Sequence, residues 1–169
     1  HNEAEVKVQR LADEKDNLIT ALNRAIVSGH LEMATKTFMA VSHILRVKGD
    51  PEQLIEVAQL ILRQSSLSPT NRLRIQMVRI GALRLTGQID RAKIASSWML
   101  ARAEESNQPR LYADCLVEAA HLRIEEGQQE IAEDYLESAR KIYANIGHLE
   151  GCARVLTLLG TALIQHGEY

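Results

Sequence analysis

Apolar residues recur along most of this chain at intervals of three and four residues, which is the spacing of one face of a helix. In the first such stretch, Leu18, Leu22, Ala25 and Ile26 fall on one face. The pattern predicts about eight helices, over residues 4–28, 30–48, 51–64, 70–86, 88–106, 109–126, 128–146 and 148–166. Because most links between them are short, neighbouring helices should run antiparallel. We therefore expect an all-α fold.

Turn signals support these boundaries. Asp50 and Pro51 follow Gly49, an order in which aspartate caps a helix and proline occupies its first turn. Thr70 or Asn71 is expected to cap the helix after the loop at residues 65–70. Pairing the helices predicts one repeat domain over residues 1–169. Its parts are a flanking helix (1–29), three helical hairpins (30–64, 70–106 and 109–146) and the first helix of a truncated or capping repeat (148–169).

Two sets of small residues recur with a period near 40. The turn glycines Gly49, Gly87, Gly127 and Gly167 stand 38, 40 and 40 residues apart, and Ser42, Gly81, Ala120 and Gly160 in the preceding helices stand 39, 39 and 40 apart. Such a recurrence is the signature of a helical solenoid, whose units bury their apolar faces by stacking. We expect a close helix crossing at each small residue, so that leucine at Gly160 would overpack it.

These positions resemble the tetratricopeptide repeat (TPR) family, in its slightly long form of about 40 residues. The small residue and the turn glycine match in all four repeats, and the alanine early in the second helix matches Ala92 and Ala132. Leu54 departs from that alanine, and no tryptophan opens the first helices. The resemblance covers residues 30–169. It implies helical hairpins stacked in a right-handed superhelix, with the first helices lining a concave groove.

A second resemblance lies in the N-terminal third. Residues 14–18, Ala21, Leu22, Ala25, Gly29 and Ala34 resemble the start of the helical region of bacterial signalling ATPases and ATP-dependent transcriptional regulators. In those proteins the repeats are a regulatory sensor arm, so the nucleotide chemistry would lie outside this chain, and the array would continue in a longer protein. The alternative is a passive adaptor that scaffolds a protein complex.

Composition narrows the function classes. The net charge of -2 argues against a general nucleic-acid or membrane-surface binder. Cys115 and Cys152 form no CxxC pair and are typical of core positions in a reducing compartment. No apolar run approaches about 18 residues, and no signal-peptide pattern opens the chain. We expect a cytoplasmic protein, and the second resemblance implies a bacterial one.

Sequence signals of catalysis are absent. The chain has no phosphate-binding GxxxxGK or GxGxxG loop, no HxxxH or HExxH pair and no GxSxG elbow. Neighbouring acids such as Glu104 and Glu105 splay apart on a helix instead of converging. We expect no enzyme activity, no cofactor, no metal and no ATP binding.

The groove implied by the resemblance supplies candidate binding residues. Register with the small residues selects Lys36, Met39, His43, Arg46, Ile75, Val78, Leu85, Asp114, His121 and Arg154, with Thr157 beside the last. They would receive a protein, a peptide or a small inducer, and a homo-oligomer stays an open alternative. Apolar Ile75, Val78 and Leu85 could equally be packing residues, and His43 and His121 ordinary satisfied or solvated histidines.

Charge is distributed in blocks. Residues 69–103 carry a net charge of +6 and residues 104–137 a net charge of -8. Attraction between adjacent repeats is one interpretation, and a dipolar surface that steers a charged partner is the other. Trp98, on a second helix and off its alanine face, is a competing candidate contact for a protein partner.

Overall fold

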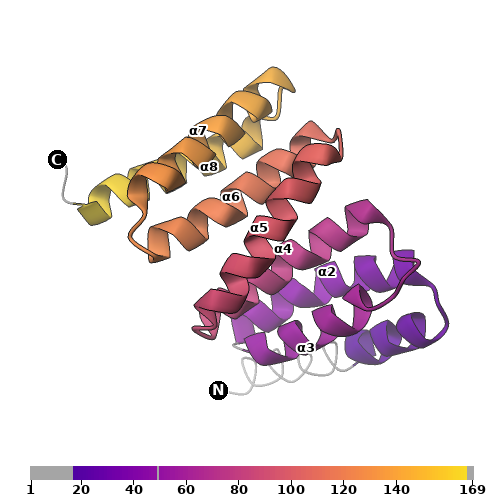
Figure 1. The fold of residues 1–169 in the computed structure, drawn as a ribbon. Coiled ribbons are helices and arrows are strands. Elements are labelled where there is room, and N and C mark those ends of the chain that lie inside the picture. The colour runs from indigo at the N-terminus through magenta and orange to yellow at the C-terminus, as the bar shows by residue number, and fades with distance from the viewer. Residues whose placement is uncertain (1–16, 49, 167–169) are drawn as a thin grey trace, which may run out of the picture. The chain divides into compact units, whose positions relative to one another are not determined.

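The computed structural model describes residues 17–48 and 50–166, with side chains except at 43, 44, 46–48 and 163–166. Within these ranges the chain is helical and contains no strand, which confirms the all-α prediction (Figure 1). Residues 17–27 form the described part of the first helix. The others are α2 (Leu31–Lys48), α3 (Pro51–Leu62), α4 (Pro69–Leu85), α5 (Ile89–Glu105), α6 (Pro109–Glu125), α7 (Gln129–Asn145) and α8 (Leu149–His166). Each of these seven begins and ends within two residues of the predicted bounds.

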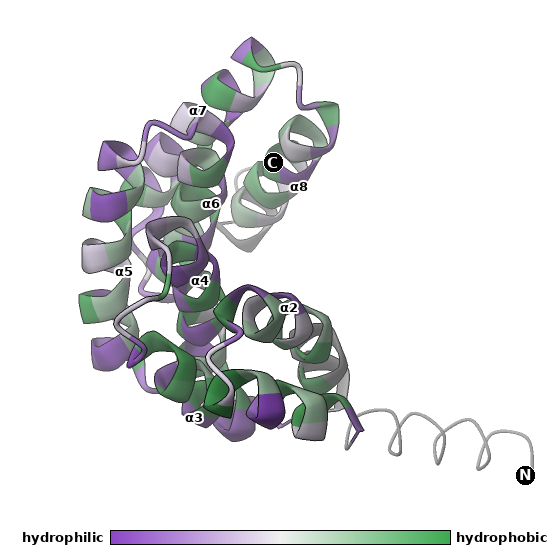
Figure 2. Ribbon diagram, turned by 90° about the vertical axis from the view of Figure 1, so that its right-hand side faces the viewer, coloured by the Kyte–Doolittle hydropathy of each residue, from purple (hydrophilic) through white to green (hydrophobic). Residues whose placement is uncertain are grey.

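The chain divides into two compact units at the Thr86–Gly87 bond. In the N-terminal unit, α2 packs against α3 and α4, and α3 also packs against α4. Its core includes Phe38, Leu45, Leu54, Ile61 and Leu73. Hydrophobic and hydrophilic segments alternate along the helices (Figure 2), as amphipathic helices around a shared core require.

The C-terminal unit is built around α7, which packs against both α6 and α8, while α5 packs against α6. Ala132, Leu136, Ala139 and Tyr143 form the buried face of α7. They share one apolar cluster with Ala113, Leu116, Val117 and Ala120 of α6 and Val155 of α8. Alanine on α6 and α7 keeps the two helices close enough for this packing. The predicted 70–106 hairpin has one helix in each unit, so that pairing and the superhelix stay predictions.

Local hydrogen bonds explain where helices begin. Asp50 caps α3 as predicted, since its Oδ1 accepts the Gln53 N–H at 3.4 Å and Pro51 follows it. The cap of α4 is Ser68, whose Oγ accepts the Asn71 N–H at 3.2 Å, so the prediction of Thr70 or Asn71 was wrong. A serine directly before Pro69 already satisfies the capping pattern.

Turn glycines end several helices in the left-handed region, where a side chain would be strained. Gly87 and Gly127 do so as predicted, and Gly49 and Gly167 lie outside the described residues. At Gly127 the chain closes a Schellman motif: its N–H donates to the Ile124 carbonyl at 3.0 Å, and the Gln128 N–H donates to the Arg123 carbonyl at 2.9 Å. Gly29 and Gly147 adopt the same conformation.

The recurring small residues are buried at Ser42, Gly81 and Ala120 but not at Gly160. A Cβ added to Gly160 would meet no atom within 4 Å in the described structure. The expected close crossing at Gly160, and with it the overpacking by leucine, is therefore wrong for this structure. The physical reason is that Gly160 is only half-buried and shares its side of α8 with the exposed residues Ala153 and Leu156.

Candidate functional site

Asp114 on α6 and Arg154 on α8 stand 40 residues apart, one repeat period, and they meet in the structure. Arg154 Nη2 donates to Asp114 Oδ1 at 2.8 Å. The same nitrogen donates to the Tyr143 hydroxyl oxygen at 2.7 Å, and that hydroxyl donates to Asp114 Oδ1 at 2.6 Å. These three side chains therefore join α6, α7 and α8 in one polar cluster.

Burial and charge fix the protonation of this cluster. Burial, together with the hydrogen bond to Asp114, raises the pKa of the Tyr143 hydroxyl well above its ordinary value. Burial lowers the pKa of Arg154, but Tyr143 and Asp114 outweigh it and leave that pKa raised. Tyr143 is thus a neutral donor at physiological pH and Arg154 a permanent cation. The Arg154 guanidinium also lies over the Tyr143 ring, 6.0 Å from its centroid.

A glycine and a histidine position the start of α8 beside this cluster. His148 Nδ1 accepts the Gly151 N–H at 2.9 Å and so caps the helix. A Cβ added to Gly151 would lie 2.6 Å from His148 Nδ1 and 2.6 Å from Tyr143 Cγ. Only glycine therefore allows α8 to approach the Tyr143 ring this closely. The His148 and Tyr143 ring centroids are 5.3 Å apart.

A polar cavity of about 370 Å³ opens next to the cluster. It is lined by Arg110, Asp114, His148, Glu150, Gly151, Ala153, Arg154 and Thr157. Three of these, Asp114, Arg154 and Thr157, were predicted from repeat register to face a ligand. Two arginines and two acids line the cavity, so it suits a polar or charged group.

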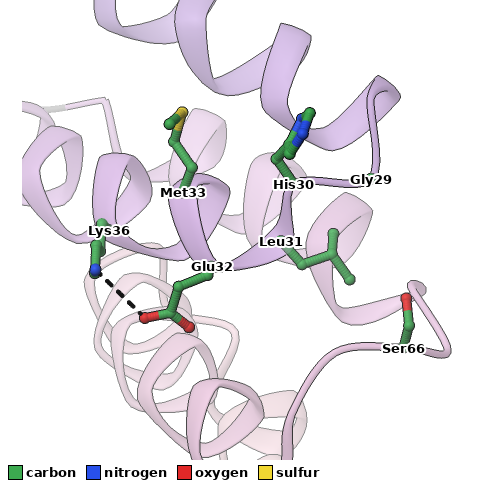
Figure 3. Close-up of a pocket in the computed structure, with 7 residues that line it drawn as sticks. All are labelled: Gly29, His30, Leu31, Glu32, Met33, Lys36 and Ser66. Carbon is green, nitrogen blue, oxygen red and sulfur yellow. Dashed lines mark ion pairs between the residues drawn. The ribbon is translucent and has the colours of Figure 1, made fainter.

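The N-terminal unit holds a second, more open cavity of about 580 Å³ (Figure 3). It is lined by Gly29, His30, Leu31, Glu32, Met33, Lys36 and Ser66. Lys36 Nζ lies 3.6 Å from Glu32 Oε1, and Asn71 Nδ2 donates to Glu32 Oε2 at 2.7 Å. The Asn71 hydrogen bond is the main cause of the lowered pKa of Glu32. Of the candidate residues, Lys36 lines this cavity.

The other candidate residues are placed differently. Ile75 and Val78 are buried, which favours their interpretation as packing residues, whereas Leu85 is 65% exposed. Met39 and His121 are half-buried. The side chains of His43 and Arg46 lie outside the described residues. The structure therefore brings together Asp114 and Arg154.

Sequence reasoning missed Tyr143, His148 and Gly151. The sequence did contain one signal for this site, because Gly151 lies in the first turn of a predicted helix. Glycine lowers helix propensity there, which implies that another segment approaches the helix closely. Tyr143 lies on the second helix of a hairpin, which the groove argument did not consider.

An ion pair joins the two charge blocks. Lys93 Nζ on α5 lies 2.5 Å from Glu126 Oε1 at the end of α6, and Arg123 Nη1 lies 2.7 Å from Glu126 Oε2. The Glu126 side chain is only 7% exposed. This pair supports attraction between adjacent helices as one role of the charge blocks. Trp98 is 40% exposed on α5 and stays a competing contact.

The described residues contain neither a cluster of metal-binding side chains nor a helix that could span a membrane. Within residues 17–48 and 50–166 no three His, Cys, Asp or Glu side chains gather where a metal ion could bind. Burial raises the pKa of the Cys115 thiol to about 12, so it stays protonated near neutral pH. Among the described helices, none has the length and apolar character that crossing a bilayer demands.

Neither a family model nor a curated protein sequence matches this chain. Among solved structures it is similar to BtubC (BKLC) from P. vanneervenii, with a TM-score of 0.77 and 14% sequence identity. The alignment covers 94% of this chain and 67% of that one. This likeness shows a shared helical fold.

Proposed function

We propose that this chain is a non-catalytic, TPR-like binding domain that serves as the regulatory sensor arm of a larger cytoplasmic signalling ATPase or transcriptional regulator. The observation that carries the binding role is the Asp114–Arg154 pair. Both residues were selected by repeat register alone, and Arg154 Nη2 lies 2.8 Å from Asp114 Oδ1 beside a polar cavity. If the first helices of successive repeats form one binding surface, residues at equivalent repeat positions should lie close together on it.

The chemistry of the cavity indicates the kind of ligand. A guanidinium carries five N–H donors, and Arg154 uses Nη2 for its contacts with both Asp114 and Tyr143. These two partners hold Arg154 in place, so less side-chain entropy is lost when a ligand binds. Arg110 lines the same cavity. The site therefore favours a carboxylate or carbonyl group of a peptide or a small inducer.

The binding role is testable with peptides selected on the intact chain from a random display library. We expect Arg154→Gln to weaken their binding by at least about tenfold in calorimetry, since it removes the charged donor, and a hydrogen bond to a charged group contributes about 1.5–3 kcal/mol. The matched control is Arg102→Gln, which removes an exposed arginine paired with Glu105 on α5. Peptides that bind both variants equally well would contradict the proposal.

The sensor role is distinguished from the passive adaptor by the rest of the gene. A sensor arm requires a P-loop ATPase module in the same polypeptide, and its ATPase rate should change when the selected peptide or inducer binds. An unchanged rate, or a gene without such a module, would favour the adaptor.

A further inference from the structure

One side of α8 is an exposed apolar stripe. Leu149 is 82% exposed and Leu156 is 58% exposed, and Ala153 and Gly160 share their side of the helix. The intervals of four, three and four residues place all four on one face. The opposite side, with Val155 and Ala162, is buried against the rest of the C-terminal unit.

The repeat register shows what such a face packs against. Forty residues earlier, the equivalents of Ala153, Leu156 and Gly160 on α6 are buried, namely Ala113, Leu116 and Ala120. They belong to the cluster that contains Ala132, Leu136, Ala139 and Tyr143 of α7. The same face is therefore covered by an amphipathic helix in one repeat and open in the next.

We infer that the stripe of Leu149, Ala153, Leu156 and Gly160 is a docking site for an amphipathic helix with the apolar spacing of α7. That spacing is small, large, small, aromatic at positions i, i+4, i+7 and i+11, as in Ala132, Leu136, Ala139 and Tyr143. The inference rests on the repeat assignment of the proposed function, because register supplies the equivalence between α6 and α8.

The chemistry of the face suits this occupant. A Cβ on Gly160 would meet no atom within 4 Å, so a helix backbone can approach there. Leu149 and Leu156 offer large apolar side chains, and half-buried Cys152 and Leu159 border them. Arg154, the cation of α8, is held toward Asp114 and Tyr143. Docking therefore buries apolar surface without stripping water from a charge on the stripe itself.

A labelled peptide of residues 128–147, which contains α7, tests the site on the full 169-residue chain. Fluorescence anisotropy should show saturable binding, and Leu156→Asp should weaken it by at least about tenfold. Ile94→Asp is the matched control, because Ile94 is an equally apolar, exposed residue on α5. A peptide carrying Leu136→Asp should bind neither the wild-type chain nor the Ile94→Asp variant.

Each other outcome overturns the inference. If sedimentation shows that the wild-type chain is monomeric and this chain does not bind the peptide, the stripe is not a helix-docking site. If the chain forms dimers that Leu156→Asp dissociates and the peptide does not compete, the occupant is a second copy. Neither result affects the Arg154→Gln experiment, so failure here is distinguishable from failure of the proposed function.

Discussion

The hydroxyl of Tyr143 donates a 2.6 Å hydrogen bond to Oδ1 of Asp114, and so links the buried face of α7 to the first helix of its hairpin. Asp114 is also the partner of Arg154 on α8. Asp114 Oδ1 on α6 thus binds side chains of both neighbouring helices, Tyr143 on α7 and Arg154 on α8. The arginine of the proposed binding site and the packing of the unit both depend on this atom. Their effects can be separated experimentally by removing one partner at a time, the Tyr143 hydroxyl or Arg154.

Tyr143→Phe removes the hydroxyl while keeping the buried ring. We expect the free energy of unfolding to fall by about 1.5–3 kcal/mol, the usual contribution of a hydrogen bond to a charged group. Urea unfolding followed by circular dichroism measures the loss. Tyr135→Phe, at a half-buried tyrosine on the same helix, is the control and should be close to neutral. Equal stability of the two variants would mean that the cluster does not stabilise the unit.

The same tyrosine predicts an alkaline limit to stability. Its pKa is raised in the folded chain, so the folded state holds the proton more tightly than the unfolded state does. This contribution is complete below about pH 10, the ordinary tyrosine pKa, and is lost as the pH rises above it. The wild-type stability should therefore fall more steeply above about pH 10 than that of Tyr143→Phe. Parallel stability curves for the two proteins would contradict the assignment.

Gly151 and Gly160 lie on the same helix and should respond oppositely to alanine. At Gly151 the new Cβ would meet the Tyr143 ring and His148 at 2.6 Å, so α8 must shift. We expect a destabilisation of about 1–3 kcal/mol, as for other overpacked sites. At Gly160 the space is open, and alanine should stabilise by up to about 1 kcal/mol through helix propensity. Thermal unfolding of both variants checks the contrast, and similar melting temperatures would refute it.

The sequence predicted the parts of this structure that depend on local periodicity. Apolar spacing and turn glycines located the helices, and the 40-residue register selected both Asp114 and Arg154 as candidates, although it did not predict the ion pair between them. Features that depend on contact between distant helices escaped it. Whether Gly160 is packed or open is decided by what lies across from it, and the tight approach at Gly151 is decided by Tyr143, eight residues away on another helix. Ile75 and Val78 show the same limit. Repeat register cannot distinguish a helix face that lines a groove from one that packs in the core when both faces are apolar.

The Lys93–Glu126 pair provides the last prediction. Glu126 is nearly buried and accepts from both Lys93 and Arg123, so Glu126→Gln leaves two cations without their counter-charge. We expect a loss of about 1–3 kcal/mol in the free energy of unfolding, smaller at high salt because Lys93 is partly exposed. Glu105→Gln is the control: its pair with Arg102 lies in solvent, and its removal should cost less than about 1 kcal/mol. If a double-mutant cycle with Lys93→Met shows no coupling, the attraction between the charge blocks does not stabilise the packing of α5 on α6, and the dipolar surface remains as their explanation.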